Sequence, residues 1–344
     1  MDKIILEYNE WLIKQNIYSM SNGLLNGRMG LCLYWYQQSR EYSNVLYEKK
    51  ASQILDEVIR NIGNSTGASF EDGLIGILMG VNYLIEEKYI DGNVKTIFSD
   101  VNDKLFQYAY FRGIDPIKED DSNYLHLIWV CIYFCKSIQS NTLSKENVEI
   151  AKRLVIEAIN SLEKAIRDNS VLLKPIACFR PFSYLLPHLL YFIKEMYAIG
   201  VYTYKLDMFC LELSKKLQQD LPIEYGYRFI LYSSIIKLTK EVGALPKGFR
   251  DVEKILSFMI NENTLLQEFR CFDLNLRQGL SGLLFYVYDT LHDPHLLVGI
   301  ENKIKECVHN NPKRWMDAKV YNLGDSMTGV LFMYQKLKKY YEKK

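Results

Sequence analysis

A short glycine frame recurs four times along the chain, each time directly before an apolar segment. The copies span residues 26–31, 72–77, 278–283 and 325–330 and share the pattern G-x-x-G, with Ser326 replacing the first glycine of the last copy. A weaker copy begins at Gly226. Glycine lets two stretches of backbone approach closely, so we expect these glycines to be structural. They are Gly27, Gly30, Gly73, Gly76, Gly226, Gly279, Gly282 and Gly329.

The apolar segments alternate with amphipathic ones. Segments that are apolar nearly all round span residues 31–38, 77–85, 127–135, 185–193, 229–238, 283–291 and 330–337. Between them, residues 51–62, 151–162 and 252–260 place apolar side chains at i, i+3, i+4 and i+7, and residues 3–14 are a further candidate. The first kind predicts helices enclosed by protein and the second predicts helices with one wet face.

A fixed period of helix pairs predicts either an open solenoid or a closed ring. Inner helices of a solenoid keep one face in solvent, which these segments do not provide. We therefore predict an all-α fold, an α/α toroid of about seven inner and seven outer helices. No linker or shift in composition divides the chain, so residues 1–344 are predicted to form a single domain.

Composition excludes several classes of partner. The 42 basic residues nearly balance the 41 acidic ones, which gives no electrostatic basis for binding nucleic acid. The longest apolar stretches are far shorter than the roughly 20 residues of a membrane span, and the N-terminal segment is unlike a secretory signal. Seven cysteines without a C-x-x-C pair favour free thiols in a reducing compartment, so we expect a cytoplasmic protein.

The glycine frames together resemble the lanthionine synthetase C-like family. The resemblance covers the whole chain and rests on LLNGRMGLCLYWY, FEDGLIGILMGVNYL, LRQGLSGLLFYVY and SMTGVLFMY. It implies an α/α toroid of seven inner and seven outer helices. It also implies zinc enzymes that add a cysteine thiol across a dehydrated residue of a ribosomally made peptide, forming the thioether ring of a lanthipeptide. The expected partners are a precursor peptide or a peptide-modifying enzyme.

The zinc ligands that the resemblance implies are replaced in this chain. The fifth repeat has Glu224 where the family has a cysteine, and the sixth has Arg277 and Gln278 where the family has Cys-His. Arginine and glutamine are not zinc ligands, so we expect no metal and no cofactor, although an active member would need zinc. A displaced site would have to draw on Cys178, Cys271, Cys307, His188, His292, His295 or His309.

Three functions stay open at this point. The first is a zinc-free member that binds a peptide or a partner enzyme. The second is an active cyclase in which His126, matched by resemblance to a candidate acid or base, deprotonates the thiol while Arg277 stabilises developing charge. In the first case, Arg277 and Glu224 are predicted to pair where zinc would otherwise lie.

The third function is a glycan-active toroid enzyme that uses a pair of carboxylates. Its candidates are Glu71, Asp72, Glu224 and Asp325, which all precede apolar helices. Acidic residues in that place are also ordinary helix caps, and we expect these four to be caps.

Overall fold

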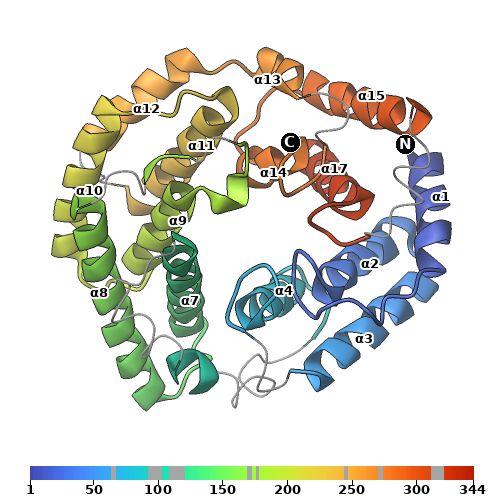
Figure 1. The fold of residues 1–344 in the computed structure, drawn as a ribbon, viewed down its shortest axis with the longest axis horizontal. Coiled ribbons are helices and arrows are strands. Elements are labelled where there is room, and N and C mark those ends of the chain that lie inside the picture. The colour runs from blue at the N-terminus through green and yellow to red at the C-terminus, as the bar shows by residue number, and fades with distance from the viewer. Residues whose placement is uncertain are drawn as a thin grey trace. The chain divides into compact units, whose positions relative to one another are not determined.

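The regular elements of the protein are helices. The computed structural model describes residues 1–62, 67–91, 103–107, 121–168, 173–175, 178–243, 247–269, 274–310 and 321–344. Within these ranges no strand occurs, which confirms the predicted all-α class (Figure 1).

Each predicted apolar segment forms a helix. These helices are α2 (Arg28–Tyr42), α4 (Leu74–Glu86), α7 (Asp121–Gln139), α9 (Leu185–Ala198), α11 (Tyr225–Val242), α14 (Leu280–Val287) and α17 (Met327–Glu342). In the four repeats with a clear frame, the helix begins three residues before the apolar run. The reason is that the first frame position is the N-cap, so the first helical turn lies inside the frame.

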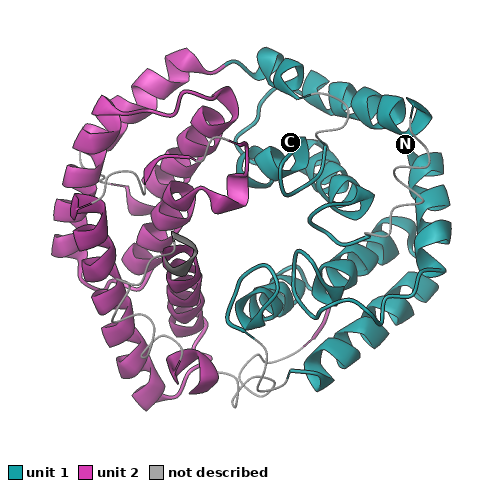
Figure 2. Ribbon diagram, viewed as in Figure 1, with its two compact units in different colours: residues 1–89, 261–344 teal, residues 90–260 magenta. Residues whose placement is uncertain are grey.

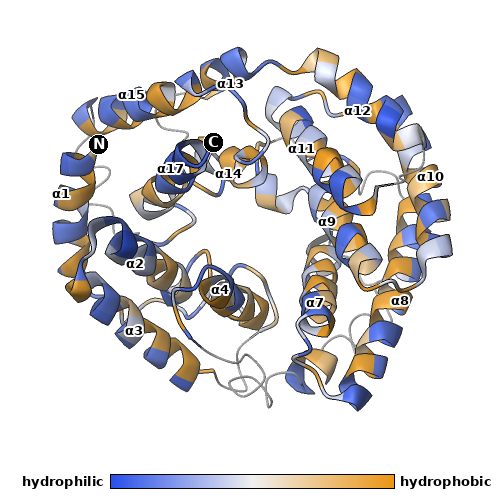
Figure 3. Ribbon diagram, turned by 180° about the vertical axis from the view of Figure 1, so that it is seen from behind, coloured by the Kyte–Doolittle hydropathy of each residue, from blue (hydrophilic) through white to orange (hydrophobic). Residues whose placement is uncertain are grey.

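The amphipathic segments form a second set of helices. They are α1 (Asp2–Ile13), α3 (Val45–Arg60), α8 (Lys145–Asp168), α10 (Thr203–Gln219), α12 (Lys247–Met259), α13 (Glu262–Glu268) and α15 (His295–Asn310). In α8 the predicted apolar stripe from Ala151 to Leu162 is buried. Figure 3 shows hydrophilic and hydrophobic sides on α8, whereas α4 is more uniformly apolar. In the described part of the chain, every helix is too short or too polar to cross a bilayer.

The chain divides into two compact units (Figure 2). The first combines both ends of the chain, residues 1–89 and 261–344, and the second is residues 90–260. In the first unit α17 contacts both α14 and α2, and α2 also contacts α4; α3 packs on α2, and α15 packs on α17. In the second unit α9 contacts both α7 and α11; α8 packs on α7, and α12 on α11 and α10.

Buried polar side chains join helices from opposite ends of the chain in the first unit. Gln38 on α2 is fully buried, and its side-chain amide pairs with that of Gln335 on α17. Asn9 on α1 donates from Nδ2 to Gln38 Oε1 at 3.2 Å. The hydroxyls of Tyr8 and Thr328, also buried, are 2.8 Å apart. Because buried amides require partners, this network defines the register of α1, α2 and α17.

Candidate functional site

The four glycine frames have the same local structure. The N-cap residues Gly27, Gly73, Gly279 and Ser326 have φ between −130° and −109° and extended ψ. Any residue can adopt this backbone conformation, so glycine is present for space. A Cβ on Gly27 would lie 2.3 Å from Gly23 N. Where Ser326 replaces glycine, its Oγ accepts a hydrogen bond from Thr328 N at 3.2 Å, as helix-capping serines do.

In three of the four frames, the second glycine packs directly against the chain that enters the helix. A Cβ on Gly76 would be 2.0 Å from Phe70 O, a main-chain atom that cannot move independently. The carbonyl oxygens of Leu24 and Leu323 approach Gly30 and Gly329 in the same way. In the fifth repeat a Cβ on Gly226 would lie 2.6 Å from the Phe179 ring. These contacts give the glycines a packing role at the repeat starts.

A ladder of backbone hydrogen bonds connects the repeat starts of the first unit. It uses the residue two before the N-cap in each repeat. Arg277 N donates to Gly324 O at 2.9 Å, Gly324 N donates to Leu25 O at 2.8 Å, and Leu25 N donates to Glu71 O at 2.9 Å. The ladder therefore runs from the sixth repeat to the seventh, the first and the second. The link from the last repeat to the first uses the same atoms as the links between consecutive repeats.

The side chain of Arg277 contacts the three other repeats that the ladder connects. Its Nε donates to Asp325 Oδ1 at 2.8 Å, Nη1 donates to Glu71 Oε2, and Nη2 donates to Asn26 Oδ1. Asn26 Nδ2 in turn donates to Asp72 Oδ2 at 2.9 Å. We call these five residues the Arg277 cluster. The planar guanidinium, with donors on three nitrogens, suits one residue that holds three neighbouring repeats.

The cluster keeps the Arg277 side chain charged and gives each of its guanidinium nitrogens a hydrogen-bond acceptor. Burial lowers the pKa of Arg277, but hydrogen bonds and the charges of Glu71 and Asp325 raise it, and the net pKa lies above its ordinary value. Each guanidinium nitrogen already donates to a cluster oxygen. A residue that stabilises a thiolate or an enolate must direct a donor at the substrate. The arrangement therefore favours a structural role, and catalysis by Arg277 stays a prediction.

The other predicted site residues lie apart from this cluster or in the second unit. Gln278 is exposed, and its backbone N–H donates to Asn275 Oδ1 at 2.7 Å. Glu224 is the N-cap of α11, and His126 lies half-buried in the first turns of α7. Both belong to the second unit, so the pairing of Glu224 with Arg277 and the joint action of His126 and Arg277 stay predictions.

The residues at the implied zinc positions do not fit a zinc site. Arg277 carries a positive charge there, and it already neutralises the nearest carboxylates, Glu71 and Asp325. Guanidinium and amide side chains are not zinc donors. Among the described residues, no group of three or more His, Cys, Asp or Glu side chains could hold a metal ion.

The residues considered for a displaced zinc site have other environments. Cys271 lies outside the described residues. Cys178 is exposed, whereas Cys307 is buried in α15. His188 is buried, its Nε2 lies 3.2 Å from Phe182 O, and burial lowers its pKa to about 3. The rest lie along α15 or just before it: His292, His295 and His309.

One of the four carboxylates before the apolar helices occupies an N-cap position, as we expected of all four. This residue is Glu224 at the start of α11, although its side chain makes no capping bond, whereas Gly73 and Ser326 are the N-caps of α4 and α17. Glu71 and Asp325 instead pair with Arg277, because their repeat starts meet at the ladder. A glycosidase needs one carboxyl free to act as an acid and a second as a base or nucleophile. The ion pairs with Arg277 do not favour that use.

The sequence contains a signal for the Arg277 cluster. The residue directly before the first frame position is polar in all four copies: Asn26, Asp72, Gln278 and Asp325. Three of these four residues belong to the cluster.

The chain matches no family model and none of the curated proteins with which it was compared.

Proposed function

We propose that the chain is a zinc-free lanthionine synthetase C-like protein that binds a peptide and does not cyclise it. The observation that carries the proposal is the Arg277 cluster. At the repeat starts where the resemblance implies a metal, an arginine is held by Glu71, Asp325 and Asn26. Zinc would activate a thiol by lowering its pKa, and a guanidinium with occupied donors does not replace that chemistry.

We further propose that residues 1–344 form one α/α toroid of about seven inner and seven outer helices. Two features support this arrangement. The apolar helices are neighbours in the order α14, α17, α2, α4 in the first unit, and α7, α9, α11 in the second. The bond from Gly324 N to Leu25 O links the last repeat to the first. In an open solenoid each repeat contacts only its sequence neighbours, and the two ends are far apart.

The test compares binding with cyclisation on one substrate. The probe is a fluorescent synthetic peptide with one dehydroalanine and one cysteine. Fluorescence anisotropy measures binding. Loss of the iodoacetamide-reactive thiol measures cyclisation, because the addition leaves the peptide mass unchanged. We expect saturable binding and cyclisation at the uncatalysed rate, with or without added zinc. Metal analysis of protein purified without chelator should give far less than one zinc per chain.

Two outcomes would contradict the proposal: cyclisation by the protein, and failure to bind the peptide. Cyclisation above the uncatalysed rate would show that the chain is an enzyme; its loss in folded Arg277→Ala would make Arg277 an electrostatic catalyst, with His126 the next residue to test. No binding of the peptide would remove the basis for a peptide partner. Co-elution with a peptide-modifying enzyme in gel filtration would then identify the enzyme as the partner.

A further inference from the structure

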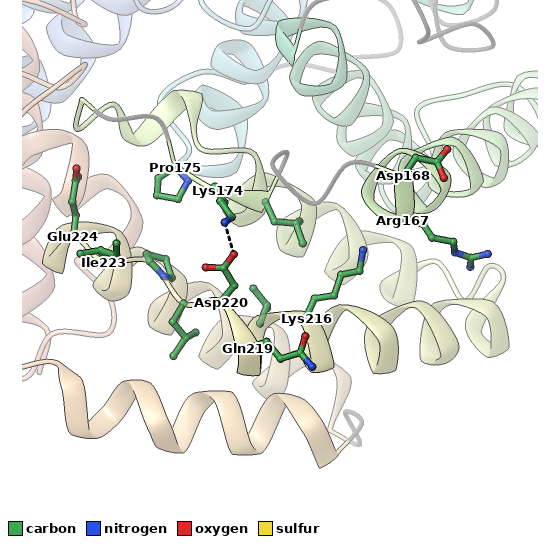
Figure 4. A pocket seen from close by; sticks show the side chains of 13 residues that line it. Arg167, Asp168, Lys174, Pro175, Lys216, Gln219, Asp220, Ile223 and Glu224 are labelled. Atoms are coloured by element: carbon green, nitrogen blue, oxygen red, sulfur yellow. Dashed lines mark ion pairs between the residues drawn. The ribbon is translucent and has the colours of Figure 1, made fainter.

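The second unit contains a pocket of about 500 Å³ beside Glu224. It lies where the end of α8, the segment 173–175 and the chain between α10 and α11 meet (Figure 4). Figure 4 shows Ile223 and Glu224 at one end of the pocket, Arg167 and Asp168 at the other, and the Lys174–Asp220 ion pair between them. The volume falls within the range of ligand-binding pockets and would hold a few side chains of an extended peptide.

The cations that line the pocket already have partners. Lys174 Nζ is 2.7 Å from Asp220 Oδ2, and Lys216 Nζ donates to Ile166 O at 2.7 Å. Arg167 pairs with Glu163 and Glu212, which lie on its own helix and on α10. The charges of Lys174 and Arg167 are therefore neutralised by carboxylates, and Lys216 is left as the one lining cation whose partner is an uncharged oxygen.

Two carboxylates of the pocket lack such partners. Among the described residues, the side chains of Asp168 and Glu224 form no hydrogen bond or ion pair. Burial raises the pKa of Glu224, since part of its hydration is removed without a compensating bond. A cation that enters the pocket would give the Glu224 carboxylate the partner that it lacks among the described residues. The charge left uncompensated in the pocket is thus negative.

An apolar side chain stands next to the carboxylate of Glu224. Ile223 lines the pocket and is 87% exposed, among the most exposed large apolar residues of the described chain. Pro175 and Pro222 add further apolar surface to the lining. Contact with an apolar group would remove this surface from water, which is favourable at about 25 cal/mol per Å². Charge and apolar surface therefore occur together at one end of the pocket.

We propose that this pocket binds an extended peptide segment in which a lysine or arginine neighbours an apolar residue, the cation on Glu224 and the apolar side chain on Ile223. The inference rests on the proposed peptide-binding function and specifies the chemistry of the bound segment. An acidic segment would be repelled by Glu224 and Asp168. The charge of Glu224 and the apolar surface of Ile223 can be removed separately, because they belong to two different side chains.

The probes are two fluorescein-labelled seven-residue peptides, one with lysine between two leucines and one with glutamate in place of the lysine. We expect the lysine peptide to bind and the glutamate peptide to bind much more weakly. Glu224→Gln should weaken the lysine peptide by about twofold to fivefold, the range for an exposed ion pair. Glu224→Lys should reverse the preference. Ile223→Ser should weaken both peptides without changing their ratio.

The matched controls lie on α12 of the same unit and outside the pocket. Asp251→Asn removes an exposed carboxylate there, and Phe258→Ser removes an apolar side chain that is 81% exposed. Both should leave the affinities unchanged. Circular dichroism of each variant shows that the helices are intact.

The outcomes separate this inference from the proposed function. If the dehydroalanine peptide binds but Glu224→Gln and Ile223→Ser change nothing, the pocket is overturned and the proposed function stands. If none of the three peptides binds, both are overturned. If 1,4-diaminobutane displaces the lysine peptide at equal concentration, the pocket binds small amines and the peptide assignment is wrong.

Discussion

Replacing Arg277 with methionine should loosen the repeat starts of the first unit. Methionine keeps a long apolar stem and removes the charge and all three donor nitrogens. Arg277 N, Gly324 N and Leu25 N form the ladder, and their carbonyl partners lie on neighbouring repeats. Without the guanidinium, only these backbone bonds and the packing around the glycines hold the repeat starts together.

The magnitude follows from the exposure of the side chains. A hydrogen bond to a charged group contributes about 1.5–3 kcal/mol when buried, and an exposed pair contributes about 0.2–1 kcal/mol. Arg277, Glu71 and Asp325 have side chains 21%, 30% and 37% exposed, between these limits. Taking about 1 kcal/mol for each of the three bonds gives roughly 3 kcal/mol, or about a hundredfold larger population of the open state.

Hydrogen exchange followed by mass spectrometry measures this local opening. Protection in segments 23–31, 274–282 and 321–327 should fall by up to about a hundredfold. Segments of the second unit should keep their protection. Arg277→Lys, which retains the charge but not the fork, should give an intermediate loss.

The control is Arg167→Met in the second unit. Arg167 also pairs with two carboxylates, but its side chain is 61% exposed, so its loss should cost less than about 1 kcal/mol. Unchanged protection of the three segments in folded Arg277→Met would refute a structural role of the cluster.

Three further results are expected. Gly76→Ala should destabilise the protein in urea by about 3 kcal/mol, since main-chain Phe70 O must move. Gly80→Ala on the same helix should stay within about 1 kcal/mol, since its Cβ meets only the side chain of Met29, which has three rotatable bonds; equal effects would contradict this. Burial lowers the pKa of His188 from 6.5 to about 3, so on acidification the unfolded chain binds a proton before the folded protein does. The free energy of unfolding should therefore fall as the pH drops from 6.5 toward 3, by up to about 1.4 kcal/mol per pH unit. His188→Gln should flatten this slope in urea titrations, and an unchanged slope would assign it to other groups. Iodoacetamide should label exposed Cys178 before Cys131, whose pKa burial raises, and peptide mapping that finds the reverse order would contradict the burial.

The sequence predicted the helices better than the contacts between them. Apolar runs and amphipathic stripes identify helices because their periodicity is local. The hydrogen-bonded pair of Gln38 and Gln335 could not be predicted from the sequence. A glutamine inside an apolar segment is expected to be buried only when a partner for its amide is known, and here the partner lies at the other end of the chain. The Arg277 cluster was hidden as well. The side-chain partners that the structure gives Arg277 come from the seventh, first and second repeats, a relation that depends on how distant segments meet.

The discontinuous first unit has a consequence for biosynthesis. Helices α1 to α4 leave the ribosome before residues 90–260 are made, and their partners α14 and α17 follow only after that segment. From residue 89 to the end of α17, synthesis at 5–20 residues per second takes roughly 13–50 s, far longer than helix formation or chain collapse takes. During that time the side of α2 that α17 covers, including Gln38, lacks that neighbour, although α1, α3 and α4 are already made. We therefore expect this apolar side of α2 to stay open to water or to other chains until α17 is synthesised.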